Sequence, residues 1–246
     1  MSAPDLSVII PAYNEALRLP PTLEKIRAHL AGSSYDLLVV DDGSQDDTAS
    51  RAEAAGARVV RNDGNRGKGY SVRRGMLMAQ GARRLMCDAD LSTPIEELGR
   101  LRARMDEGYD VVIASRALPE SRIEIRQPWH RETMGRVFNL CVRLLALPGL
   151  HDTQCGFKLF TAGAAEAAFT AALLDGFSFD VEALFIARRR GFRIAEVPVV
   201  WRNDEATRVD TFKGAVAFAD LLRIRLNDRR GAYDGPAAAR GGGEAL

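Results

Sequence analysis

The sequence predicts an α/β fold in which helices cover both faces of a mostly parallel central sheet. Over roughly the first 115 residues, short apolar runs typical of buried strands alternate with helical patterns, and this alternation is characteristic of parallel sheets. The chain has 246 residues, of which 46% are hydrophobic and 27% are charged. This length and balance suit one sizeable domain with a filled core, which we place at residues 1–230.

Five strands are expected in the first half of the chain. Leu6–Ile10 is an apolar run that ends before a proline, and Leu37–Val40 is a second apolar run. Further runs follow at Arg58–Arg61, Arg84–Cys87 and Asp110–Ala114. Each run is brief and bounded by turn-forming residues, which is typical of a buried strand.

Helix-start signals follow the first four of these strands. Proline in the first turn, small polar caps and early acidic residues all favour the beginning of a helix. The signals are Pro20 and Pro21, then Ser44 with Asp46 and Asp47, then the Gly-rich loop Asn62–Gly69, and finally Thr93 with Pro94 and Glu96.

The second half of the chain is less regular. Helices are predicted near residues 131–147, 180–190 and 211–229, and a strand is predicted near residues 192–201. The tail, residues 231–246, is rich in Gly and Ala, so we expect it to be disordered.

Composition narrows the classes of function. The formal net charge is +1, so the chain lacks the positive excess of a nucleic-acid-binding protein. Its three cysteines, Cys87, Cys141 and Cys155, are widely spaced and odd in number, which favours reduced thiols in the cytoplasm. No apolar run approaches the ~18 residues that span a bilayer, so any work at a membrane is expected from its surface.

Polar residues follow three of the predicted strands. Pro11-Ala-Tyr-Asn-Glu15 follows the first strand, Asp41 and Asp42 follow the second, and Asp88-Ala-Asp90 follows the fourth. Ligands of open α/β sheets bind outside the carboxyl ends of the strands. The three segments therefore predict a binding site at one edge of the sheet.

Asp88 and Asp90 can face one bound cation. Carboxylate oxygens suit Mg²⁺ or Mn²⁺, which also keep waters and substrate phosphates as ligands. Such a cation would neutralise a diphosphate and stabilise it as a leaving group. The alternative is a solvated turn with a helix cap.

Asp41 and Asp42 are adjacent acids that repel each other unless a donor or a cation compensates. A nucleobase N–H and a ribose hydroxyl are suitable donors, and a helix-capping turn is the alternative.

In Asn65-Arg-Gly-Lys-Gly69, Arg66 and Lys68 stand among glycines before a helix. Exposed amides there favour a phosphate, and an exposed basic turn is again the alternative.

Arginines are concentrated after the fifth strand, where a basic loop could hold an anionic acceptor over the site. A solvated charged loop is the alternative. The predicted helices near 131–147 and 211–229 combine apolar and basic residues, so they could lie on an anionic membrane or simply face the core. The arginines of the basic loop after the fifth strand are Arg116, Arg122, Arg126 and Arg131.

Together these segments resemble the inverting glycosyltransferases of family 2, which have the GT-A fold, a Rossmann-like nucleotide-diphospho-sugar transferase fold. Within the family, the sequence is most similar to dolichyl-phosphate β-glucosyltransferases and bacterial polyprenyl-phosphate glycosyltransferases. The resemblance covers roughly residues 5–225, and the last two of its six motifs are the most specific. The motifs are Val8–Glu15, Val39–Ser44, Asn65–Gly69, Asp88–Asp90, Asp152–Phe160 and Phe179–Glu182.

The resemblance implies roles for particular residues, with Asp88 and Asp90 as metal ligands and Lys68 near the diphosphate. Related mannosyltransferases often have a glutamine at the position of Ser92, so a third protein ligand of the metal is missing from this pattern. Some relatives also have C-terminal transmembrane helices, which this sequence lacks. The implied nucleotide-sugar-binding residues are Pro11, Tyr13, Glu15, Asp41, Asp42, Lys68 and Asp88, and the implied acceptor-phosphate residues are Arg116 and Arg131.

The resemblance further implies transfer of a hexose, expected to be glucose, from a UDP-sugar to a polyprenyl or dolichyl phosphate. The enzyme would be cytoplasmic and peripheral at the inner face of the cell membrane. A phosphate acceptor is largely ionised at neutral pH and needs no general base. A hydroxyl acceptor needs one, and Asp180 is then the candidate. The implied catalytic residues are Asp90, which serves the metal, and Asp180.

Other functions stay open at this point. The same fold could act on a soluble sugar or a protein hydroxyl, or it could bind a nucleotide sugar without transferring it. A nucleotidyltransferase is disfavoured, because such enzymes are expected to have a Gly-rich basic loop where this chain has Pro11-Ala-Tyr-Asn-Glu15.

Overall fold

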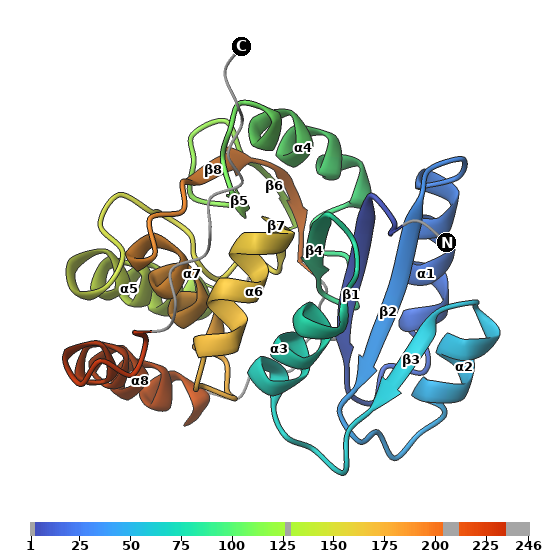
Figure 1. Ribbon diagram of the computed structural model, residues 1–246, viewed down its shortest axis with the longest axis horizontal. Coiled ribbons are helices and arrows are strands. Elements are labelled where there is room, and N and C mark those ends of the chain that lie inside the picture. The colour runs from blue at the N-terminus through green and yellow to red at the C-terminus, as the bar shows by residue number, and fades with distance from the viewer. Residues whose placement is uncertain (1–2, 126–128, 204–211, 235–246) are drawn as a thin grey trace.

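The computed structural model describes residues 3–125, 129–203 and 212–234, with the backbone alone at 129–132 and 212–215. A seven-stranded sheet runs through the described chain in the order β3-β2-β1-β4-β7-β5-β8 (Figure 1). Its pairs are parallel except where β7 lies antiparallel between β4 and β5. The strands are β1 (Leu6–Ala12), β2 (Tyr35–Asp41), β3 (Arg58–Arg61), β4 (Arg83–Cys87), β5 (Val111–Ser115), β7 (Phe157–Thr161) and β8 (Ile194–Pro198).

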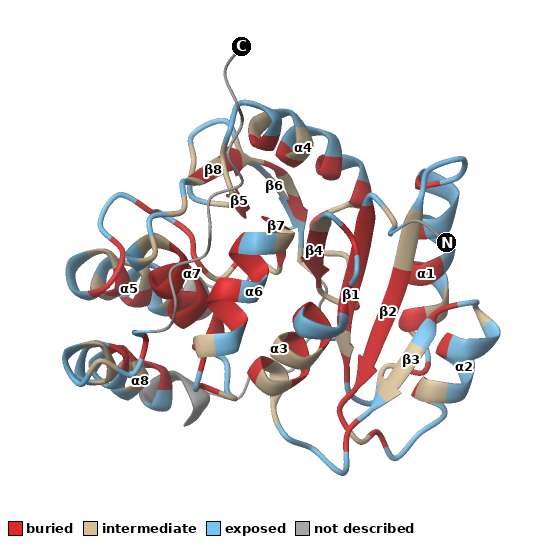
Figure 2. Cartoon of the chain, viewed as in Figure 1, coloured by how far each residue is buried: buried red, intermediate tan, exposed pale blue. Residues whose placement is uncertain are grey.

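Helices pack on both faces of the sheet, as the sequence predicts. One hydrophobic core joins helices α1, α2 and α4 to one face of the sheet. A second core joins helices α3, α5, α6, α7 and α8 to the other face (Figures 1 and 2). Side chains alternate between the faces along each strand, so Leu38 belongs to one core and Val39 to the other. The helices are α1 (Leu19–His29), α2 (Thr48–Ala54), α3 (Lys68–Met78), α4 (Leu98–Asp106) after a 3₁₀ turn (Ile95–Glu97), α5 (Trp129–Leu145), α6 (Ala162–Ala171), α7 (Phe179–Arg189) and α8 (Phe212–Arg229).

The strand expected near residues 192–201 is two strands. After β8, the chain leaves the main sheet at Pro198, and β9 (Val200–Arg202) pairs with β6 (Arg122–Ile125) in a separate two-stranded sheet. Proline has no N–H to donate to a neighbouring strand, so it is a natural place for the pairing to change.

β7 is the element of the sheet that the sequence patterns do not predict, because a lysine interrupts its apolar run. Its direction matters for the site. β7 begins where β4 and β5 end, since Phe157 pairs with Cys87 at the end of β4. The residues before β7, from Asp152 to Gly156, therefore lie at the carboxyl edge of the parallel strands.

The ordered chain extends beyond the expected boundary at residue 230. Tyr233 is only 1% exposed, and its ring packs edge-on against Phe185 of α7 with 6.1 Å between centroids. The prediction of a disordered tail from residue 231 is therefore wrong for residues 231–234. Residues 235–246 lie outside the described part of the chain.

Candidate active site

Asp88 and Asp90 follow β4 at the carboxyl edge of the sheet. The backbone N–H of Asp88 donates to the carbonyl of Gly156 at 3.0 Å, and a Cβ on Gly156 would overlap the Asp88 carboxylate. Asp90 accepts a hydrogen bond from the N–H of Ser92 at 2.9 Å, and Leu91 between them has φ of +45°. The turn after β4 is thus held in a conformation that leaves both carboxylates partly exposed.

Lys68 reaches the same place from the first turn of α3. Its Nζ lies 2.6 Å from Oδ1 of Asp88. Burial lowers the pKa of Lys68, but the negative charges of Asp88 and Asp180 raise it and prevail, so the side chain stays an ammonium ion. The structure therefore brings together the residues that the sequence patterns place at a diphosphate and its metal.

Asp180 lies in the first turn of α7 and pairs with a lysine that the sequence analysis did not single out. Nζ of Lys158 lies 2.7 Å from Oδ1 of Asp180 and donates to the carbonyl of Cys155 at 2.5 Å. Burial raises the pKa of Asp180, while Lys158 and Lys68 act in the opposite direction. A lysine in the middle of the apolar strand β7 was the available sequence signal, because a buried ammonium requires a partner.

Asp42 has partners inside the protein. Its carboxylate accepts hydrogen bonds from Asn62 Nδ2 at 2.8 Å, Arg66 N at 3.0 Å, Gly67 N at 2.9 Å and Ser71 Oγ at 3.0 Å. Asp42 thereby fixes the loop between β3 and α3, which carries Lys68 at its end. Asp42 therefore has a structural role beside the nucleoside contact that the resemblance implies.

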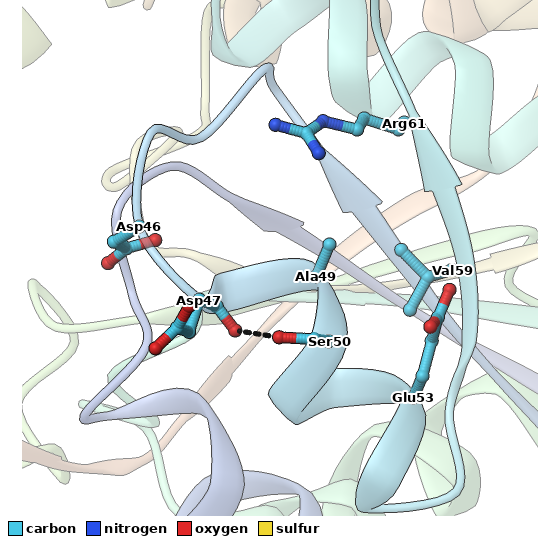
Figure 3. Close-up of a pocket in the computed structure, with 7 residues that line it drawn as sticks. All are labelled: Asp46, Asp47, Ala49, Ser50, Glu53, Val59 and Arg61. Carbon is cyan, nitrogen blue, oxygen red and sulfur yellow. Dashed lines mark hydrogen bonds between the residues drawn. The ribbon is translucent and has the colours of Figure 1, made fainter.

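Asp41 is buried on the other side of the same turn. It accepts from Ser44 N at 3.0 Å, and Arg61 Nε lies 3.2 Å from its second oxygen. Arg61 and the loop amides thus offset the repulsion between the two adjacent acids. Arg61 also borders a surface hollow between α2 and β3, whose lining includes neither Asp88 nor Asp180 (Figure 3).

The Gly-rich loop packs tightly against the segment that precedes α7. The N–H groups of Gly69 and Tyr70 both donate to the carbonyl of Asp175, at 2.8 and 3.3 Å. A Cβ on Gly69 would lie 2.6 Å from the carbonyl oxygen of Leu174, and one on Gly67 would overlap that of Asp175. These glycines permit close packing, and the expectation that the amides are exposed for a phosphate is wrong for Gly69 and Tyr70.

The segment after β1 lies beside the segment after β2. The N–H of Asn14 donates to Ser44 Oγ at 2.9 Å, and the N–H of Glu15 donates to Thr48 Oγ1 at 2.8 Å. Glu15 forms an ion pair with Arg18 at 2.7 Å. Pro11 is partly buried and Tyr13 is 41% exposed, so the tyrosine ring offers a surface on which a planar base can stack.

Arg116 follows β5 and is held by Asp152, the first residue of a family motif. Nε and Nη2 of Arg116 donate to the two oxygens of Asp152 at 2.6 and 2.8 Å, and the guanidinium lies 5.4 Å from the ring centroid of Trp201. Burial raises the pKa of Asp152, but Arg116 lowers it below its ordinary value and prevails. Arg131 belongs to α5, and its side chain lies outside the described residues.

The residues after β4 fit a hard divalent cation. Two carboxylates face the site, and Gly156 leaves room beside the first of them. Among the described residues, no third acidic, histidine or cysteine side chain joins them. Substrate phosphates and water would have to complete the coordination of Mg²⁺ or Mn²⁺.

This fold and site define a glycosyltransferase. The family model described as glycosyl transferase family 2 matches residues 7–169, more than half of the chain, and the chain belongs to that family. The fold is GT-A, as the resemblance implied.

Particular relatives carry more specific names. The chain is 35% identical to the dolichyl-phosphate beta-glucosyltransferase of Dictyostelium discoideum, over 90% of this chain and 74% of that protein. It is 33% identical to the human protein of the same name, over 93% and 77% of the two chains. Among solved structures, glucosyl-3-phosphoglycerate synthase from Mycobacterium tuberculosis in complex with Mn²⁺, UDP-glucose and phosphoglyceric acid superposes with a TM-score of 0.68 at 23% identity, covering 90% of this chain and 79% of that chain.

Proposed function

We propose that this enzyme transfers glucose from UDP-glucose to a dolichyl or polyprenyl phosphate, with inversion at the anomeric carbon. The observation that carries the proposal is the grouping of Asp88, Asp90 and Lys68 at the carboxyl edge of the sheet. The names of the relatives support the lipid phosphate as acceptor and glucose as the sugar. The Mn²⁺ and UDP-glucose bound by the structural neighbour support the donor and the metal.

On the donor side, Asp88 and Asp90 would hold Mg²⁺ or Mn²⁺, which would supply positive charge against the diphosphate. Lys68 adds an ammonium beside these carboxylates, 2.6 Å from Asp88. The exposed ring of Tyr13 offers a stacking surface for the base, and we assign Pro11, Glu15, Asp41 and Asp42 to the same nucleotide-sugar site. The contribution of these groups is mainly electrostatic and positional.

On the acceptor side, an oxygen of the lipid phosphate forms a bond to the anomeric carbon. The bond from that carbon to the UDP oxygen breaks, and its electron pair leaves with the diphosphate. The second pKa of a phosphate monoester is about 6, so the nucleophile is already ionised at neutral pH. Arg116 would position it, and Arg131 is its proposed partner.

The ion pair of Asp180 with Lys158 favours this version over transfer to a hydroxyl. A hydroxyl acceptor must lose a proton, and Asp180 is the candidate base. Burial raises the pKa of Asp180 and outweighs the opposing charges of Lys158 and Lys68, but Nζ of Lys158 lies 2.7 Å from Oδ1 and already occupies that oxygen. A preformed phosphate anion makes no such demand.

We further propose that α5 and α8 contact the cytoplasmic surface of a membrane. Among the described residues, no helix is both long and apolar enough to cross a bilayer. α5 and α8 pack together through Phe138 and Phe218. The exposed positions of the two helices, pale blue in Figure 2, include apolar residues and arginines. Leu144 is 74% exposed, and such an amphipathic surface suits an anionic interface. The exposed apolar residues are Met134, Val137, Leu140, Leu144 and Leu145 on α5, and Val216, Leu222 and Leu226 on α8.

Product analysis tests the transfer reaction. The purified protein is incubated with Mn²⁺ or Mg²⁺, a short polyprenyl phosphate and a panel of UDP- and GDP-sugars, and the products are identified by mass spectrometry. Glucosyl-phosphoryl-prenol from UDP-glucose is the expected product. If no nucleotide sugar gives a lipid-linked product, the acceptor proposal fails. UDP binding with neither transfer nor hydrolysis would instead indicate a binding protein.

Flotation with vesicles that contain anionic lipid tests the membrane surface. Leu144→Glu should reduce the bound fraction, because it places a negative charge in the apolar stripe of α5. Leu77→Glu on α3, also at an exposed leucine, is the matched control and should bind as the unmodified protein does. Equal binding of all three proteins would contradict a role for α5.

A further inference from the structure

Glu182 is a fully buried carboxylate in the motif that also contains Asp180. Its Oε2 accepts hydrogen bonds from the N–H groups of Leu173 and Leu174, at 2.9 and 2.8 Å. Its Oε1 accepts one from the hydroxyl of Tyr233 at 2.7 Å. Glu182 thus joins two distant parts of the chain, the segment before α7 and the residues after α8.

The segment from 172 to 178 lies directly against the loop that carries Lys68. The carbonyl of Asp175 accepts hydrogen bonds from the N–H groups of Gly69 and Tyr70. Its Oδ1 lies 2.7 Å from Nη2 of Arg73 in α3. Because the glycine that follows Lys68 has no room for even a Cβ, a shift of this segment would be transmitted to the first turn of α3. A chain of contacts therefore runs from Glu182 through the backbone of Leu174 and Asp175 to the residue after Lys68.

Tyr233 is held in place by several independent contacts. Its hydroxyl accepts from Asn227 Nδ2 at 3.3 Å, and its carbonyl accepts from Arg190 Nη2 at 3.3 Å. The neighbouring Asp234 forms an ion pair with Arg189 at 2.6 Å. The turn after α8 is therefore fixed to α7, and the phenol is directed at the buried carboxylate.

We propose that Tyr233 and Glu182 form a clamp that positions Lys68 for the diphosphate of the donor. Both are positioning residues, since neither touches the donor site directly. The clamp makes the end of α8 a determinant of donor binding, so a change after α8 would alter the affinity for the nucleotide. This inference rests on the proposed function for the identity of the donor, but the mechanical link can be measured without it.

Three substitutions separate the clamp from general packing. Tyr233→Phe removes only the hydroxyl, which donates a hydrogen bond to Glu182 and accepts one from Asn227. Glu182→Gln is the conservative variant, because its amide oxygen can accept both backbone N–H groups and its NH₂ can donate to the phenol. Tyr109→Phe is the matched control, because it removes a hydroxyl that bonds to Arg104 at 3.1 Å near the start of β5, at the opposite edge of the sheet.

The first measurement is amide hydrogen exchange in the absence of nucleotide. Tyr233→Phe should speed exchange in peptides covering residues 69–74 and 172–178, while Tyr109→Phe should leave both at the rate of the unmodified protein. Unchanged exchange in Tyr233→Phe, or equal acceleration in both variants, would overturn the clamp whatever the enzyme transfers.

The second measurement is UDP binding with Mn²⁺, together with steady-state kinetics. Tyr233→Phe loses the buried hydrogen bond to Glu182 and the longer, partly buried one from Asn227. We predict about fivefold weaker UDP binding, with a similar rise in the donor KM and no change in the acceptor KM. Glu182→Gln should stay within about twofold of the unmodified protein. Equal changes in both KM values would indicate a structural role only. Failure of the unmodified protein to make a lipid-linked product would contradict the proposed function and leave the exchange result standing.

Discussion

Nζ of Lys158 lies 2.7 Å from Oδ1 of Asp180, and both side chains are almost completely buried. The candidate base of the sequence analysis is thus half of an ion pair. The opposite charges of such a pair stabilise each other, and removing one partner leaves an uncompensated charge in the interior. The pair of Lys158 and Asp180 leads to two predictions, one about catalysis and one about stability.

Asp180→Asn should spare much of the transfer to a phosphate and abolish transfer to a hydroxyl. The reason is that an ionised phosphate needs no proton acceptor, whereas a hydroxyl does. Product formation with a polyprenyl phosphate and with a sugar alcohol can be compared in parallel, with UDP binding as the control for an intact donor site. Complete loss of phosphate transfer with UDP binding retained would count against the base-free reaction.

Lys158→Met should destabilise the protein by about 3 kcal/mol at neutral pH, since Asp180 would be left charged and buried. Burial already raises the pKa of Asp180, and loss of the lysine raises it further. A raised pKa means that the folded state gains stability as the pH falls and the carboxyl takes up a proton. Denaturant unfolding should therefore show a smaller deficit at mildly acidic pH. The double variant Lys158→Met with Asp180→Asn should lose this pH dependence, and its persistence would contradict the assignment.

Gly69→Ala should cost about 2 kcal/mol or more and weaken UDP binding. The new Cβ would lie 2.6 Å from the carbonyl oxygen of Leu174 and 2.7 Å from Cβ of Phe179, so the segment before α7 must move. Gly99→Ala in α4 is the control, because its Cβ would meet no described atom within 4 Å beyond its own helix turn. Thermal unfolding should show that the control is unchanged or slightly stabilised, and a neutral Gly69→Ala would contradict the tight packing.

Asp152→Asn should lower stability by about 3 kcal/mol at neutral pH, because Arg116 loses its buried bidentate partner. Arg116 holds the pKa of Asp152 below its ordinary value of 3.8. The stabilisation is therefore present above pH 3.8 and is lost as the pH falls from there through the lower pKa of the folded state. Unfolding free energies should converge for the two proteins under acid. Asp63→Asn, at an exposed aspartate, is the control variant. If the difference in unfolding free energy between Asp152→Asn and the unmodified protein stays the same at every pH, ionisation of Asp152 does not contribute to stability.

Much of the donor side was predictable because its signals are local. Apolar runs followed by Asp88 and Asp90, or by Asp41 and Asp42, mark strand ends, and parallel strands bring their ends to one edge. The patterns missed β7, since Lys158 breaks its apolar run. They also placed Tyr233 in a disordered tail, because Gly- and Ala-rich composition does not reveal the buried carboxylate that the phenol reaches.

The sequence by itself determined the alternation of strands and helices, the family motifs and the presence of carboxylates at the strand ends. Only the tertiary structure decided which charge faces which partner. Asp42 binds the amides of the loop before α3, Asp180 binds Lys158, and Glu182 binds Tyr233. The last two pairs join residues 22 and 51 positions apart. Such pairings depend on how the antiparallel strand β7 and the end of α8 pack onto α7, and local residue patterns do not encode that packing. The physical reason for the pairings is general, because buried charges and hydrogen-bonding groups need partners wherever the fold places them.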